Sequence, residues 1–379
     1  MDNKKICFIA SAPNGIISFH KTNIELLSKE FDVYVIANFS DRTIFDDLCI
    51  KEAIPVNIAR RPSIIENIGA IVELYKIFRE YKFDCFVSMS SNASLLASIA
   101  GYMARTPKRI RIFTGQIWAN SKGIKRTFFK TIDKITVALN TSILVDGKPQ
   151  RDYLVENGII KLGQGTVLAN GSICGVDITK FSPNERIRKE ERKKLGIKDS
   201  DVVFTFMGRV NRDKGIFELL EAANRLFSEV NGAVLVLIGD MEGLTPDVLS
   251  HNSKLHVGKN VILYGFTKEP YKALQLSDVF CLPSYREGFG MSAIEAASLS
   301  LPVICSDIYG LRDSFVPNET GLSCKVKDFL SLYESMKKLY SNEQLRIELG
   351  EKGRKRVEQM FDKELVSMAW FEYLKKLLS

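Results

Sequence analysis

A short apolar run, a glycine loop and a helical pattern follow one another in the stretch VFCLPSYREGFGMSAIEA, which spans residues 279–296. The apolar run 279–282 predicts a buried strand, and the glycine loop after it opens a helix. Free backbone N–H groups and the positive dipole end of such a helix N-terminus bind phosphate groups. The stretch therefore predicts one strand–loop–helix unit of a parallel α/β sheet, with an anion site at the carboxyl end of the strand.

The same alternation of short strands and longer helices runs through the rest of the chain. In the first half, strands are expected at 5–10, 33–37, 55–59, 85–88, 109–113, 142–145 and 166–168, and the clearest helix at Ile64–Tyr81. In the second half, strands are expected at 202–207, 234–238, 261–263, 279–282 and 303–305. Strands that alternate with helices form parallel sheets with crossover helices, so the expected fold class is α/β with doubly wound, Rossmann-like sheets.

The length of 379 residues and one polar break indicate two such domains. Gly, Ser, Asn and Pro concentrate between Asn170 and Pro183, which marks a linker. We expect an N-terminal domain at 1–170, the linker at 171–183 and a C-terminal domain at 184–358. An amphipathic helix at 359–379 is expected to close the chain by packing across the domains.

Composition excludes several classes of protein. Apolar residues make up 45% and charged residues 26% of the chain, as in a globular protein with a sizeable core, and no long apolar window predicts a transmembrane helix. The seven cysteines form no C-x-x-C pair, and Cys7, Cys85, Cys281 and Cys305 lie in apolar runs. This pattern favours reduced core thiols in a cytoplasmic protein over a disulfide framework or a zinc site.

The net charge of +8 is concentrated in one segment. From Arg105 to Lys134 there are nine Lys or Arg residues and one acid, Asp133, so this segment alone accounts for +8. Phe128, Phe129 and Ile132 are interleaved with the cations at helical spacing. Such a segment indicates an anionic partner, and a basic helix with an apolar face can dock on an anionic membrane surface. Nucleic acid is not expected, because the segment lacks spaced aromatic residues for base stacking.

Four charged residues accompany the glycine loops of the second half. Glu287 enters the 288–290 loop, and Glu295 lies about one turn into the helix, within reach of a ribose hydroxyl. A second loop, after the strand 202–207, carries Arg209 and Lys214, and two cations can neutralise a diphosphate leaving group without a metal. Taken singly, each group is an ordinary residue of a turn or a helix; the combined spacing favours a nucleotide site.

Together these segments resemble the retaining glycosyltransferases of family 4, which have the GT-B fold of two Rossmann-like domains facing a cleft. The family hallmark is a Glu, seven residues and a second Glu, which Glu287 and Glu295 match. The resemblance implies that Arg209 and Lys214 hold the diphosphate, Glu295 the ribose and Glu287 the donor sugar, with Glu287, Arg209 and Lys214 as the catalytic set. The wider donor site that it implies comprises Gly15, Gly208, Arg209, Lys214, Gly239, Phe266, Glu287, Gly288, Phe289, Gly290, Met291 and Glu295.

The resemblance also implies an activity. It is the transfer, with retention, of a hexosyl or N-acetylhexosaminyl group from a nucleotide-diphosphate sugar, UDP more often than GDP. The acceptor would be a glycan, lipid-linked in bacterial O-antigen, capsule or exopolysaccharide synthesis, with the enzyme peripheral on the inner face of the membrane and needing no metal. Many relatives carry a His after the strand 109–113, where this chain has Thr114 and Gly115. His20, early in a helix, fits either the acceptor side or a structural role.

Other interpretations use the same residues. The run 288–293 fits the dinucleotide fingerprint G-x-G-x-x-A, with Asp307 near the expected acid position, which would suit a nicotinamide-dependent oxidoreductase. That interpretation leaves Arg209, Lys214 and Glu295 without a role. A protein of this fold that only binds, without catalysis, is a further alternative. Asp199 and Asp201 form a D-x-D, but they directly precede a strand, as a polar turn does, and His251 and His256 show no metal-ligand spacing.

Overall fold

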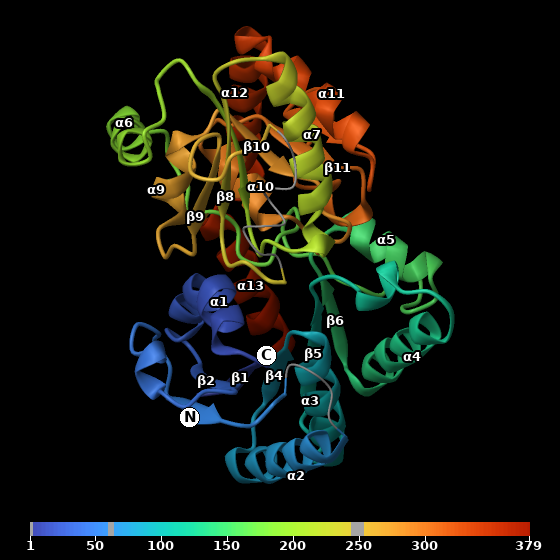
Figure 1. The fold of residues 1–379 in the computed structure, drawn as a ribbon. Coiled ribbons are helices and arrows are strands. Elements are labelled where there is room, and N and C mark those ends of the chain that lie inside the picture. The colour runs from blue at the N-terminus through green and yellow to red at the C-terminus, as the bar shows by residue number, and fades with distance from the viewer. Residues whose placement is uncertain (1–2, 60–63, 244–253) are drawn as a thin grey trace. The chain divides into compact units, whose positions relative to one another are not determined.

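The structure, a computed structural model, describes residues 3–59, 64–243 and 254–379. The chain divides into two compact units, Met1–Gly175 with Lys363–Ser379, and Val176–Asp362. Each unit is built on one parallel sheet of six strands (Figure 1). Two doubly wound α/β units were predicted from the alternating strands and helices, and that prediction is confirmed.

The sheet of the first unit has the strand order β3-β2-β1-β4-β5-β6. Its strands are β1 (Lys5–Ile9), β2 (Asp32–Ala37), β3 (Glu52–Pro55), β4 (Cys85–Ser88), β5 (Lys108–Phe113) and β6 (Ser142–Val145). Its helices are α1 (Pro13–Leu27), α2 (Ile64–Tyr81), α3 (Ser91–Met103), α4 (Gly123–Leu139), α5 (Lys148–Glu156) and α13 (Lys363–Leu378). Helix α2 packs on α3 and α3 on α4, whereas α1 packs on α13. Right-handed crossovers that run in opposite directions from β1 and β4 place these two groups on opposite faces of the sheet.

The second unit repeats this topology with the order β12-β11-β10-β7-β8-β9. Its strands are β7 (Val202–Met207), β8 (Ala233–Ile238), β9 (Val261–Gly265), β10 (Val279–Leu282), β11 (Val303–Ser306) and β12 (Gly321–Cys324). Its helices are α6 (Glu185–Lys194), α7 (Ile216–Glu229), α9 (Pro270–Ala273), α10 (Met291–Ser298), α11 (Phe329–Tyr340) and α12 (Glu343–Met360). The strands β7 to β9 follow one another in one direction across the sheet, and β10 to β12 follow in the opposite direction. The topological switch point therefore lies between β7 and β10, which are neighbours in the sheet.

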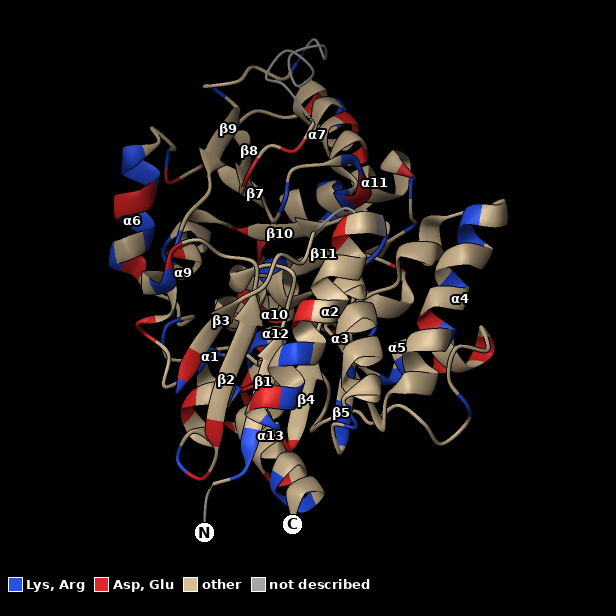
Figure 2. Cartoon of the chain, turned by 90° about the horizontal axis from the view of Figure 1, so that it is seen from below, with Lys and Arg blue, Asp and Glu red and all other residues tan. Residues whose placement is uncertain are grey.

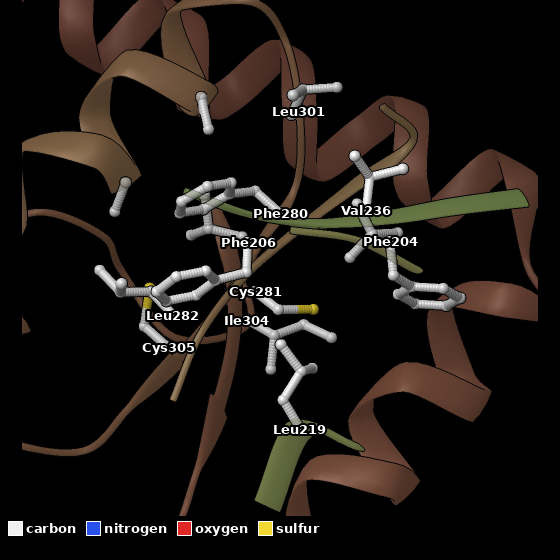
Figure 3. Close-up of a cluster of buried hydrophobic side chains, with 14 of the residues drawn as sticks. Phe204, Phe206, Leu219, Val236, Phe280, Cys281, Leu282, Leu301, Ile304 and Cys305 are labelled. Carbon is white, nitrogen blue, oxygen red and sulfur yellow. The ribbon is translucent and has the colours of Figure 1, made fainter. Parts of the chain in front are cut away.

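The core of the second unit lies on both faces of its sheet. Figure 3 shows part of it, where Phe204 and Phe206 of β7 lie near Phe280 of β10 and Ile304 of β11. All four side chains are fully buried. Because helices cover both faces of a parallel sheet, its strands are apolar along their whole length, which is why they stand out in the sequence.

Three strand predictions differ from the structure. The strand expected at 55–59 lies at β3, Glu52–Pro55, an edge strand whose charged first residue and final proline hide it from a hydrophobicity pattern. The segment expected at 166–168 makes only one bridge, between Thr166 and Leu144. Strand β12 was not predicted, because Gly321 and Ser323 interrupt its apolar pattern.

Helix α13 returns the end of the chain to the first unit. Ser367 donates a hydrogen bond to Asn23 of α1 at 2.8 Å, and Lys375 pairs with Glu30 at 2.9 Å. His20 is fully buried in this packing, with its ring 5.3 Å from that of Trp370 and its Nδ1 3.1 Å from the Asn23 amide. Burial lowers the pKa of His20 to about 3, so this imidazole is neutral and belongs to the core.

Candidate functional site

The predicted phosphate-binding groups of the second unit meet at its topological switch point. The loop after β7 carries Gly208, Arg209 and Lys214, and the loop after β10 carries Glu287 and the glycines 288 and 290. Strands β7 and β10 are adjacent and parallel, so both loops leave the sheet at the same edge. Ligands of doubly wound sheets bind at this position.

Glycines allow these loops to approach one another closely. A Cβ atom on Gly239, at the end of β8, would lie 2.0 Å from the carbonyl oxygen of Gly208, and a Cβ on Gly215 would lie 2.1 Å from that of Pro283. Both glycines have positive φ, 131° and 71°. The backbone N–H of Tyr285 also bonds to the carbonyl of Asp213 at 2.9 Å. The loops after β7, β8 and β10 therefore pack closely on one another at the carboxyl ends of the strands.

Lys214 and Glu287 form an ion pair at this edge. Lys214 Nζ lies 2.5 Å from Glu287 Oε1, and the Ser284 hydroxyl donates to the same oxygen at 2.8 Å. The Lys214 and Glu287 side chains are only 18% and 14% exposed. Among the described residues, Glu287 Oε2 has no hydrogen-bond partner. The structure thus brings together two of the three predicted catalytic residues and leaves one carboxylate oxygen available to a ligand.

Arg209 is held separately. Its NH1 lies 3.1 Å from Oε2 of Glu242, in the loop after β8, and the same oxygen accepts a hydrogen bond from Asn211 Nδ2 at 3.1 Å. The Arg209 side chain is 61% exposed. Its guanidinium therefore keeps most of its donors free for an anion. Glu242, Asn211 and Ser284 were not predicted; their signal in the sequence was that each lies within three positions of a predicted residue.

Helix α10 begins directly after the glycine loop, where a phosphate-binding helix terminus is expected. Gly290 precedes it with φ 81°, its N-terminus has no side-chain cap, and its first turn contains no acidic residue. The Phe289 side chain packs on Phe361 with ring centroids 5.2 Å apart and is buried. Phe289 can therefore reach a ligand only through its backbone.

Glu295 lies partly buried on α10 without a hydrogen-bond or ion-pair partner among the described residues. Burial raises the pKa of its carboxyl to about 7. A carboxyl group that gives up water and gains no protein partner is suited to hydroxyl groups brought by a ligand.

The remaining predicted residues are placed as follows. Phe266 follows β9 and is 64% exposed, which leaves its ring accessible for stacking on a base. Gly239 packs against Gly208, so its part is to let the loops after β7 and β8 approach each other. Gly15 lies in the first turn of α1, in the other unit, and its backbone N–H bonds to the carbonyl of Ala12 at 3.3 Å. Thr114 is exposed after β5.

The structure divides the basic segment 105–134. Arg111 is buried and pairs with Asp133 at 2.5 Å, and Trp118 Nε1 donates to the same carboxylate at 2.7 Å, so this charge is internally neutralised. Arg109 bonds to the carbonyls of Thr106 and Leu139, at the edge of the sheet where β5 begins. The cations of α4, together with Lys122 before it, form the remaining group of the segment.

The structure also places the residues on which the alternative interpretations depend. Strand β10 ends at Leu282, so the first glycine of the 288–293 motif does not directly follow the strand, as a dinucleotide fingerprint requires. Asp201 accepts a hydrogen bond from the Lys198 N–H at 2.9 Å, in the turn before β7 at the opposite edge of the sheet. His251 lies outside the described residues.

The chain is similar in sequence to known glycosyltransferases. Residues 187–356 match the family model "Glycosyl transferases group 1". The chain is 28% identical to the capsular polysaccharide biosynthesis glycosyltransferase CapM of Staphylococcus aureus, over 97% of this chain and 95% of that protein. It is 25% identical to the UDP-Gal:α-D-GlcNAc-diphosphoundecaprenol α-1,3-galactosyltransferase of Escherichia coli, over 90% and 89%.

Solved structures show the same fold. HepE from Anabaena, in complex with UDP-glucose, superposes with a TM-score of 0.81 at 16% identity and covers 98% of this chain and 99% of that one.

Among the described residues, no helix is long and apolar enough to cross a membrane.

Proposed function

This chain belongs to the group 1 glycosyltransferases, family 4 of the GT-B class, and we propose that it transfers a sugar from a UDP-sugar to a lipid-linked glycan during bacterial surface-polysaccharide synthesis. The observation that carries the proposal is that the Lys214–Glu287 ion pair, the exposed guanidinium of Arg209 and an uncapped helix terminus all belong to loops at one switch point. The relatives named above act in capsule synthesis and on a diphosphoundecaprenol-linked acceptor, which supports the context.

Each group at the switch point has a part in donor binding. Arg209, Lys214 and the N-terminus of α10 hold the diphosphate. Glu295 accepts hydrogen bonds from the ribose hydroxyls, and the exposed ring of Phe266 stacks on the base. Glu287 uses the oxygen not bound to Lys214 to accept a hydrogen bond from the donor sugar.

The chemistry is charge stabilisation at the leaving group. As the glycosidic bond breaks, negative charge grows on the β-phosphate, and Arg209 and Lys214 are placed to stabilise it. The anomeric carbon becomes oxocarbenium-like. The acceptor hydroxyl attacks this carbon from the same face as the departing diphosphate, so the anomeric configuration is retained. A phosphate oxygen of the donor takes the proton of the acceptor hydroxyl. In this scheme no carboxylate acts as a nucleophile; Glu287, whose Oε1 is bound by Lys214 and Ser284, contributes a hydrogen bond to the donor sugar.

The first unit supplies the acceptor side, and its helix α4 docks on an anionic membrane. Ile124, Phe128 and Ile135 are spaced along one face of α4, and all three are exposed, Ile124 at 90% and Phe128 at 58%. Lys122, Lys125 and Lys134 around them are exposed as well, and basic residues are visible along α4 in Figure 2. An outward apolar stripe flanked by cations is typical of a helix that lies in the membrane interface.

Two cations of this segment have another role. Arg126 NH2 and Lys130 Nζ share Oδ1 of Asn157, at 3.0 and 3.4 Å, and both lie over the Trp118 ring. They fasten α4 to the end of α5, so they contribute less to membrane binding than the three exposed lysines.

A binding and transfer assay tests the proposal. The purified chain should bind UDP more tightly than GDP in calorimetry, and it should transfer sugar from a panel of UDP-sugars to a diphosphoprenol-linked saccharide with the anomeric configuration retained. Tighter binding of GDP would reject the proposed nucleotide. Transfer to a free oligosaccharide but to no lipid-linked one would reject the proposed acceptor.

A further inference from the structure

We propose that Glu242 is a positioning residue that presets both cations of the diphosphate site; this inference rests on the proposed function. Glu242 lies in the loop after β8, whereas Arg209, Asn211 and Lys214 lie in the loop after β7. No feature of the sequence pattern joins the two loops. The contacts that join them are backbone hydrogen bonds and one shared carboxylate oxygen.

The two loops are joined first through their backbones. The Val210 N–H bonds to the carbonyl of Asp240 at 2.8 Å, and the Glu242 N–H bonds to the carbonyl of Val210 at 3.0 Å. Val210 itself is fully buried. Side chains alternate along an extended segment, so Arg209 and Asn211, on either side of Val210, share the other face. This geometry brings both side chains to the Glu242 carboxylate.

One oxygen of Glu242 then holds both of them. Oε2 accepts from Arg209 NH1 and from Asn211 Nδ2, each at 3.1 Å. The contact to Arg209 uses one edge of the guanidinium, and within the described residues Nε and NH2 have no partner. The carboxylate therefore restrains a long, exposed side chain while leaving donors free for a diphosphate. Restraint before binding reduces the conformational entropy that the ligand must otherwise overcome.

Asn211 links the Glu242 carboxylate to the second cation, Lys214. Its Oδ1 accepts a hydrogen bond from the Lys214 N–H at 3.2 Å, capping the short turn Arg212–Lys214. An amide has one donor end and one acceptor end, so donation to Glu242 fixes which end faces Lys214. Lys214 in turn reaches Glu287 of the loop after β10. Contacts therefore run from Glu242 through Asn211 and Lys214 to Glu287, and they join three loops at the switch point.

Calorimetry on the full chain tests this role. Glu242→Ala should weaken UDP binding about three- to tenfold, the expected cost of ordering one or two free side chains. UMP, which lacks the second phosphate, should lose much less. Glu242→Gln should retain most of the affinity, because its amide carbonyl can accept both hydrogen bonds. Glu348→Ala removes a comparably exposed carboxylate from an ion pair on α12 and is the matched control.

The alternatives give different results. Tighter UDP binding by Glu242→Ala would show that the carboxylate competes with the diphosphate, and equal losses for UDP and UMP would show a general structural role; either overturns the inference. In an Arg209→Ala background, the effect of Glu242→Ala should shrink, and an unchanged effect would also contradict it. If the wild-type chain bound neither UDP nor GDP, the proposed function would fail; if it bound UDP and Glu242→Ala bound it equally well, only the role of Glu242 would fail.

Discussion

Lys214 Nζ lies 2.5 Å from Glu287 Oε1, although the two residues come from loops that follow different strands. Lys214, which we propose stabilises the leaving group, and Glu287, which we propose contacts the donor sugar, therefore act as a unit. Substitutions of either one alter the other, so their effects on catalysis should not be additive.

Removal of either cation should slow transfer. Arg209→Ala and Lys214→Ala should each lower kcat by roughly 10²–10³-fold, the scale of losing one donor that stabilises charge in the transition state. Initial rates of sugar transfer measure the effect. Arg186→Ala, which removes an exposed ion pair on α6, is the control. Near-normal turnover in both site variants would remove these residues from the mechanism.

Substitutions of Glu295 and Glu287 should affect different steps, UDP binding for Glu295 and sugar transfer for Glu287. Glu295→Ala should weaken UDP binding, because its carboxyl has no partner among the described residues and is proposed to accept hydrogen bonds from the ribose. Glu287→Ala should leave UDP binding nearly intact and lower transfer, because its second oxygen is proposed to bind the donor sugar and not the nucleotide. Calorimetry with UDP and rate measurements on the same variants check the division. Equal losses of UDP affinity would contradict it.

Donor binding should depend on pH through Glu295. Burial raises the pKa of this carboxyl to about 7 from an ordinary 4.5, so it is largely protonated below pH 7 and ionised above it. Ribose hydroxyls donate to the ionised form, so binding of UDP-glucose should strengthen from pH 6 to pH 8 and release a proton near pH 7. Calorimetry in buffers of different ionisation enthalpy measures that proton. Glu295→Gln should abolish the release, and a release that persisted would assign it to another group.

The same shift should affect stability. A carboxyl whose pKa is higher in the folded than in the unfolded state favours folding while it is protonated, and this contribution is lost as the pH rises through about 7. Glu295→Gln should therefore raise the melting temperature relative to wild type more at pH 8 than at pH 5. A shift of equal size at both pH values would contradict the assignment.

Gly239 should be intolerant of a side chain. Gly239→Ala places a Cβ about 2.0 Å from the Gly208 carbonyl oxygen at φ 131°, so we expect a loss of about 1–3 kcal/mol in the free energy of unfolding, measured in urea, and weaker diphosphate binding. Gly258→Ala, also at positive φ but with no neighbouring atom within 4 Å, is the matched control. Equal losses would show that only backbone strain matters.

Membrane binding should depend on the outward face of α4. Changing Lys122, Lys125 and Lys134 to Gln should reduce co-sedimentation with anionic liposomes, because each well-placed cation adds about 1 kcal/mol at such a surface. Ile124→Ser with Phe128→Ser should also reduce it, without a change in the melting temperature, since both side chains are exposed. Arg126→Gln with Lys130→Gln should instead lower stability. Equal recovery with neutral and anionic vesicles would rule out the electrostatic docking.

The predictions that succeeded rested on local patterns. Buried parallel strands such as β7 and β10 are continuous apolar runs, and a glycine loop before a helix has a recognisable composition. The two doubly wound sheets and the glycine loop that opens α10 could therefore be found without coordinates. The expectation failed at β3 and β12, where edge positions tolerate Glu, Pro, Gly and Ser and the pattern fades.

Tertiary structure alone decided which charges meet. The +8 of the segment 105–134 is a property of the sequence, but only packing shows that Arg111 is neutralised by Asp133 and that Arg126 and Lys130 are held at Asn157. Likewise, the residues before and after Arg209 do not indicate its pairing with Glu242, which is 33 positions away. Local sequence specifies backbone conformation through short-range sterics and periodicity, whereas a contact between loops depends on where the sheet places the ends of its strands, and that is determined by the order of strands in the folded chain.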